Sequence, residues 1–124
     1  MANLQEVINV LNNVHNLINS NNQNLTFQGN YGLYINYTNK SLTIHHNSAA
    51  MQRAINSRRR NNTGAVPYLE PTNNNNDIWV VGFDNFTEVI AFAYMFVDMM
   101  HRLYGEKWAL SASDGINRGQ IPIF

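Results

Sequence analysis

The segment between Asn85 and Gly105 constrains the fold of this chain more than any other. Its apolar side chains cover more than half of a helical wheel and leave a narrow polar wedge, in which Asp98 and Arg102 stand four residues apart. Residues 85–88 have the spacing of a capping box, and the glycine stands where a helix stop belongs. A helix with so much apolar surface packs into a core or against another subunit.

A second amphipathic helix is predicted near the start of the chain. Apolar residues recur at steps of three and four from Leu4 to Ile18, and Val10 and Leu17 widen the stripe. Asparagine fills the opposite side, since 22 of the 124 residues are Asn and only two are Lys. Asn is a mediocre helix former, so packing must stabilise this helix. The wide stripe predicts contact with two surfaces, the domain's own sheet and a neighbouring subunit.

Short alternating segments between these helices predict an antiparallel meander. The other predicted elements are strands at 25–28, 33–38 and 42–45, a two-residue hairpin at Asn39-Lys40 and a short helix at 49–57 capped by Ser48. They are followed by a loop through Pro67 and Pro71 to Asn76, a strand at 78–83 covered on both faces, a turn at 114–115 and an extended tail at 120–124. The order is α-β-β-β-α-β-α. The fold class is therefore α+β, with an antiparallel meander sheet packed with an N-terminal helix and a long C-terminal helix in one domain over residues 1–124.

Composition excludes several classes of protein. The absence of Cys excludes a disulfide scaffold and a thiolate nucleophile, and a net charge of zero disfavours general coating of nucleic acid. The first residues carry no basic region leading into an apolar core, so no signal peptide is expected. The longest apolar stretch, 89–100, is broken by Asp98 and is too short to span a bilayer. A soluble cytoplasmic protein without a membrane partner is expected.

Arginine forms the one dense charge feature. Arg53, Arg58, Arg59 and Arg60 supply half of the eight positive residues. Guanidinium groups bind phosphate or carboxylate through two points and stack on bases, so the cluster predicts an anion site. The alternative is a solvated helix end, where cations complement the C-terminal dipole and need no ligand.

Two further side chains are candidates for the same ligand. Tyr34 alternates with the apolar set of its strand and is the best candidate for an exposed aromatic group on which a base could stack. His45 is expected on the polar sheet face as a base or an anion contact. It is adjacent to His46, and neighbouring strand residues point to opposite faces, so the pair predicts no metal site.

No constellation of catalytic residues stands out. The acidic residues show no dyad spacing, the serines no nucleophile elbow and the glycines no phosphate-cradling loop. We therefore expect no catalytic residue, no cofactor and no metal.

Three functions remain open. The first is a small non-catalytic intracellular binding protein that holds an anionic ligand, such as a nucleotide or its derivative, and forms a homo-oligomer through its N-terminal and C-terminal helices. The second is a structural or protein-interaction subunit, such as a virion component or an inhibitor that docks on a host protein. The third is a small enzyme acting on a phosphodiester or glycosidic bond. Compact chains without Cys or motifs are typical of viruses and mobile elements, which suggests a role in host interference.

Overall fold

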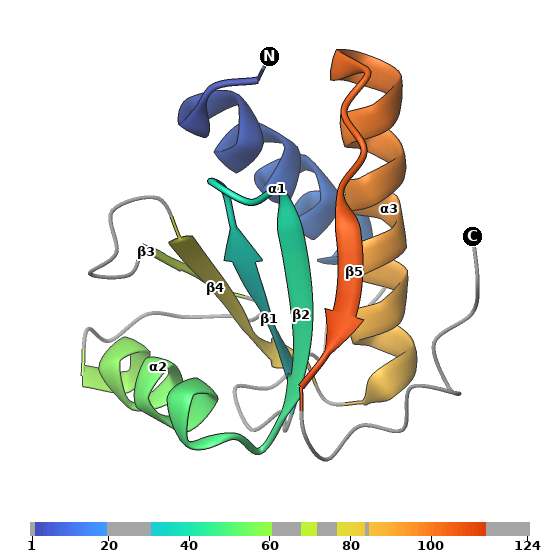
Figure 1. The fold of residues 1–124 in the computed structure, drawn as a ribbon. Coiled ribbons are helices and arrows are strands. Elements are labelled where there is room, and N and C mark those ends of the chain that lie inside the picture. The colour runs from blue at the N-terminus through green and yellow to red at the C-terminus, as the bar shows by residue number, and fades with distance from the viewer. Residues whose placement is uncertain (1, 20–30, 61–67, 72–76, 84, 114–124) are drawn as a thin grey trace.

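The computed structural model describes residues 2–19, 31–60, 68–71, 77–83 and 85–113. Within these residues a five-stranded sheet carries α1 and α3 on one face and α2 on the other (Figure 1). The elements are α1 (Leu4–Asn19), β1 (Tyr31–Asn36), β2 (Ser41–His46), α2 (Ala49–Arg60), β3 (Tyr68–Pro71), β4 (Asp77–Phe83), α3 (Phe86–Tyr104) and β5 (Ala109–Ala112). The strand order is β3-β4-β1-β2-β5.

The α+β class is confirmed, but the sheet is mixed rather than purely antiparallel. β1 pairs antiparallel with β2 and β4, whereas β5 runs parallel to β2. After α3 the chain returns along the open edge of β2, where the Ala109 amide donates to the Lys40 carbonyl at 3.1 Å and the Ser113 amide to the Ile44 carbonyl at 2.9 Å. The prediction of a purely antiparallel sheet was therefore wrong, because β5, a strand that was not predicted, adds a parallel pairing.

Three predictions about the connections also need correction. The segment read as a loop forms the edge strand β3, in which Pro71 is tolerated because an edge strand lacks a second partner. The hairpin at Asn39-Lys40 is a four-residue turn, 37–40, in which Asn36 Oδ1 accepts from the Asn39 amide at 2.9 Å and Lys40 takes the positive φ of 53°. α2 continues to Arg60, three residues beyond its predicted end. The predicted strand at 25–28, the turn at 114–115 and the tail at 120–124 lie outside the described residues.

The main core lies between α1, α3 and the sheet. Leu33, Ile35, Leu42 and Ile44 face this core from β1 and β2. Val10 is only 2% exposed and belongs to the same core, so its predicted place on a subunit contact was wrong. Leu17, the other residue that widens the stripe, is 50% exposed.

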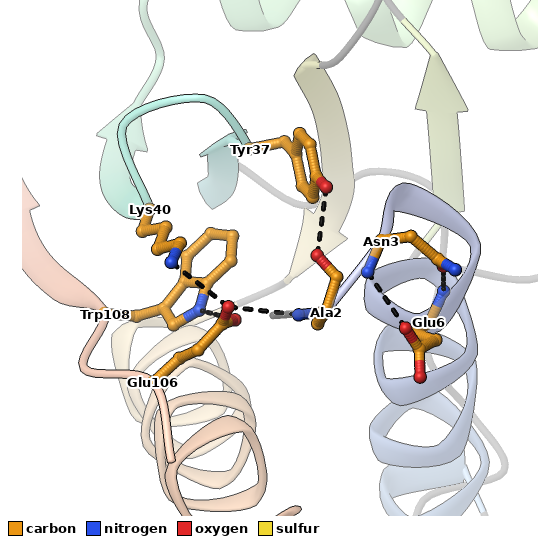
Figure 2. Close-up of polar contacts among 7 residues, drawn as sticks. All are labelled: Ala2, Asn3, Glu6, Tyr37, Lys40, Glu106 and Trp108. Carbon is orange, nitrogen blue, oxygen red and sulfur yellow. Dashed lines mark hydrogen bonds and ion pairs between the residues drawn. The ribbon is translucent and has the colours of Figure 1, made fainter. Parts of the chain in front are cut away.

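Both long helices begin with caps encoded in the sequence. Asn85 Oδ1 accepts from the Glu88 amide at 2.9 Å, and Gly105 ends α3 in the left-handed region with a φ of 66°, as predicted. α1 carries a reciprocal capping box that sequence reasoning missed (Figure 2). The Glu6 amide donates to Asn3 Oδ1 at 2.8 Å, and the Asn3 amide donates to Glu6 Oε1 at 2.9 Å.

A buried carboxylate joins three distant parts of the chain (Figure 2). Glu106, which is 8% exposed, accepts from the Ala2 amide and from Lys40 Nζ, each at 3.1 Å, and from Trp108 Nε1 at 3.4 Å. The Tyr37 hydroxyl donates to the Ala2 carbonyl at 2.9 Å. Burial alone would raise the pKa of Glu106, but the hydrogen bonds from Lys40, Ala2 and Trp108, together with the Lys40 charge, hold that pKa below its ordinary value. We call these five residues the Glu106 cluster.

Candidate functional site

The α2 side of the sheet holds three rings in contact, which we call the ring cluster: Tyr34, His45 and Trp79. The centroid of the Trp79 ring lies 5.0 Å from that of Tyr34 and 4.8 Å from that of His45. Tyr34 and Trp79 are register partners on β1 and β4, and His45 comes from β2 on the other side of β1. Trp79 is 8% exposed, whereas the other two rings are only half-buried. Tyr34 is therefore less exposed than its alternation predicted, but both Tyr34 and His45 remain partly exposed.

A glycine lets α2 approach this cluster. Gly32 lies opposite His45 in the β1–β2 register. A Cβ atom on Gly32 would lie 3.1 Å from Cγ and Sδ of Met51 and 3.3 Å from the Val80 carbonyl oxygen. The missing side chain allows the fully buried Met51 of α2 to pack against the sheet beside Trp79. The docking of α2 and the ring cluster are thus parts of one packing arrangement.

Two polar contacts hold side chains of the ring cluster in place. The Tyr34 hydroxyl donates to the carboxylate of the buried Asp77. His45 Nδ1 lies 2.9 Å from Ser48 Oγ, which also caps α2 by accepting from the Met51 amide at 3.1 Å, as predicted for Ser48. Ser48 Oγ has two lone pairs, so while it accepts this amide it can either donate its own proton to Nδ1 or accept one from it, and the contact suits either neutral tautomer of His45. Burial lowers the pKa of His45 and favours the neutral form.

The histidine of the ring cluster is expected to remain neutral at pH 7 and to resist protonation in mild acid. Burial holds the pKa of His45 below 6.5, whereas the same histidine in the unfolded chain takes up a proton at about pH 6.5. Between these two pKa values the unfolded state binds more protons than the folded state. The contribution of neutral His45 to stability is therefore present above about pH 6.5 and is lost as the pH falls towards the lower pKa of the folded state. An NMR titration of the His45 imidazole measures the value directly. A midpoint at or above 6.5 would contradict the expectation, and His45→Asn should remove this pH dependence from the melting temperature.

The predicted arginines lie on α2 but at different distances from the rings. Arg53 is exposed in the middle of the helix, and Arg58, Arg59 and Arg60 form its last three residues. α2 begins beside His45, so its rise of about 1.5 Å per residue places the arginine run roughly 14 Å further along the helix. The structure therefore brings Tyr34 and His45 together, places Arg53 nearer to them, and keeps the arginine run at the far end of α2. That end is also where cations complement the helix dipole.

A hydroxyl pair continues the α2-side face towards the β5 edge. Thr43 Oγ1 and Ser111 Oγ lie 3.2 Å apart on β2 and β5, and Thr43 is the register partner of Tyr34. Ser111 is exposed and Thr43 half-buried. The Ser111 hydroxyl donates to the Leu42 carbonyl at 3.3 Å, and the oxygens of both hydroxyls can accept from a bound polar group. The α2 side of the sheet thus offers partly exposed rings and hydroxyls next to an arginine-bearing helix.

Sequence reasoning missed several of these residues. Trp79 and Asp77 share one face of β4 by their spacing of two, but every residue of β4 is buried, so its uniform apolar pattern did not show which face carries the rings. Ser111 was missed because β5 was not predicted. Among the described residues no three His, Cys, Asp or Glu side chains gather as a metal site, and no helix is long and apolar enough to cross a membrane.

Comparison of the chain with models of protein families, with curated proteins and with solved structures finds no match. The candidate site therefore stands on the contacts of the ring cluster, on the hydroxyl pair and on the arginines of α2.

Proposed function

We propose that this protein is a small non-catalytic binding protein that holds an anionic ligand on the α2 side of its sheet. The observation that carries the proposal is the ring cluster beside an arginine-bearing helix. Aromatic rings and guanidinium groups together are the chemistry that recognises a nucleotide, since bases stack on ring faces and arginines bind phosphate. The favoured ligand class is therefore a nucleotide or a nucleotide-derived molecule.

The parts of the site suit different parts of such a ligand. The half-buried Tyr34 and His45 would contact the base, and the hydroxyls of Thr43 and Ser111 would contact the sugar or the edge of the base. Arg53 and the arginine run at the end of α2 would neutralise phosphates. In a chain of zero net charge, four arginines on one helix would dominate the local field and draw an anion towards α2.

The hydrogen bonds that the polar groups of the site already make support binding rather than catalysis. Ser48 Oγ is held as a helix cap, His45 Nδ1 is held by Ser48, and Asp77 accepts from Tyr34. A nucleophile and base need mutual contact with a third group that orients the base. The Ser48 contacts serve the docking of α2 instead, and the Tyr34–Asp77 bond joins β1 to β4. A cytoplasmic role in host interference, in which the protein sequesters a signalling nucleotide, fits this proposal.

Native mass spectrometry tests the proposal on protein freshly purified without extensive dialysis. A retained anionic mass is expected for the parent chain. Arg53→Ala combined with Arg59→Ala and Arg60→Ala should lose that mass and the binding of a fluorescent adenosine triphosphate analogue. Arg102→Ala is the matched control, because Arg102 lies on α3 on the other face of the sheet and pairs with Asp98 at 3.0 Å. Equal binding by both variants, or no nucleotide-class mass on the parent, would contradict the proposal.

A second function is favoured by a different observation. Leu17 and Leu103 are 50% and 58% exposed, which suits a structural or protein-interaction subunit that buries them against another protein. In that case the arginines of α2 would meet an acidic surface. The two functions separate in the experiment above, because an interaction subunit carries no small anionic mass.

A further inference from the structure

An open groove runs between the two helices that cover the core. It has a volume of about 490 Å³ and is lined by Asn13, Asn16 and Leu17 of α1 and by Met99 of α3. Leu103 lies one helical turn beyond Met99 and is 58% exposed. Among the described residues Leu17 and Leu103 are the two large hydrophobic side chains that are exposed. The exposed Leu103 side chain thus lies one turn along α3 from Met99, the residue that α3 contributes to the groove.

In the described part of the chain, the surface around the groove has no excess charge and is complementary to a second copy of this chain. A two-fold contact sets each surface against itself, so a rim of one charge sign would repel its own copy. The exposed side of α1 carries amides instead: Asn9, Asn12, Asn13 and Asn16. Each amide both donates and accepts hydrogen bonds and is therefore complementary to an identical group. On α3 the nearby charges of Asp98 and Arg102 neutralise each other within one copy.

We infer that α1 and α3 form the contact of a two-fold symmetric homodimer, in which Leu103 enters the groove beside Leu17 and Met99 of the second copy. A two-fold axis between the groove and Leu103 makes this contact twice, once in each direction. The two helices have 16 and 19 residues and span about 24 and 28 Å, long enough to frame the roughly 800 Å² per partner that a stable interface buries. This contact does not depend on the proposed ligand.

Sedimentation velocity tests the dimer with Leu17→Lys and Leu103→Lys. Both positions lie in the last turn of their helices, where a cation suits the dipole, and both side chains are exposed, so the variants should fold. We expect the parent to sediment as a dimer and both variants as monomers with unchanged far-UV circular dichroism. Asn56→Lys adds the same charge to the exposed surface of α2 and should remain a dimer. A monomeric parent, or Lys variants that remain dimers, would overturn the inference.

Cysteine pairing tests the register, since the chain has no Cys of its own. Asn16→Cys and Leu103→Cys are prepared separately, mixed, and oxidised. A mixed disulfide should form faster than either homodisulfide, because Leu103 of one copy faces the groove of the other. Faster formation of the Leu103→Cys homodisulfide would place the axis at Leu103 and overturn the groove assignment.

Discussion

Glu106→Gln is expected to lower the free energy of unfolding by about 3 kcal/mol at neutral pH. The carboxylate accepts from Ala2, Lys40 and Trp108, and all three contacts lie in or at the edge of the core. Glutamine is nearly the same size but brings an NH2 group against these donors and leaves Lys40 without its counter-charge. Urea denaturation of both proteins measures the difference. Glu88→Gln, which changes a half-buried carboxylate in the first turn of α3, is the matched control and should lose much less.

Glu106 also makes the stability of the protein depend on pH in the acid range. The folded pKa of Glu106 lies below its ordinary value of 4.5, so the unfolded chain takes up the proton first as the pH falls. Its contribution to stability is therefore full above about pH 4.5 and is lost as the pH falls through the lower folded pKa. Glu106→Gln should show a flatter stability profile in this range. Parallel profiles for the parent and the variant would contradict the role given to the Glu106 cluster.

Trp79→Ala is expected to lower the free energy of unfolding by about 3–5 kcal/mol, the range for deleting a large aromatic side chain from a core. The ring contacts Tyr34 and His45 and packs with Met51, so its removal leaves a cavity between the sheet and α2. Thermal unfolding gives the size of the loss, and hydrogen exchange should show the amides of α2 losing protection before those of α3. Trp79→Phe keeps a ring and should lose roughly 1.5 kcal/mol.

The order in which the helices lose protection from hydrogen exchange tests the role of the ring cluster more directly than the loss of stability does. If Trp79→Ala destabilised the chain but left the amides of α2 as protected as in the parent, the ring cluster would not be what docks this helix. The proposed ligand face would then lose its connection to the arginines of α2.

The helices could be predicted from the sequence because their signals are local. α3 shows a stripe at helical spacing between Asn85 and Gly105, and both caps act within four residues. β5 could not be predicted, because its four residues show no strong alternation and its place is set by backbone bonds to Lys40 and Ile44 far away in the sequence. The same holds for β3, which becomes a strand only because β4 offers it an edge.

The residues of the candidate site could likewise be predicted only where the signal is local. Tyr34 and His45 were found because alternation assigns a face to each residue of a half-buried strand. Trp79 and Asp77 were hidden in β4, which is buried throughout. The Glu106 cluster was missed because the sequence around Glu106 is ordinary, and its burial is imposed by Ala2 and Lys40 from distant segments.

The bond between Ala2 and Glu106 spans 104 residues and has a consequence for how the chain folds. During synthesis α1 leaves the ribosome before α3, so the apolar stripe of α1 is exposed while its partners on α3 have not yet been made. The hydrogen bond from Ala2 to Glu106, which holds the start of α1 in place, can form only after Glu106 has been synthesised. Contacts between residues so far apart in the sequence slow folding. The asparagines on the other side of α1 then have a second use, because they keep an early helix polar on one side without charges that would have to be matched later.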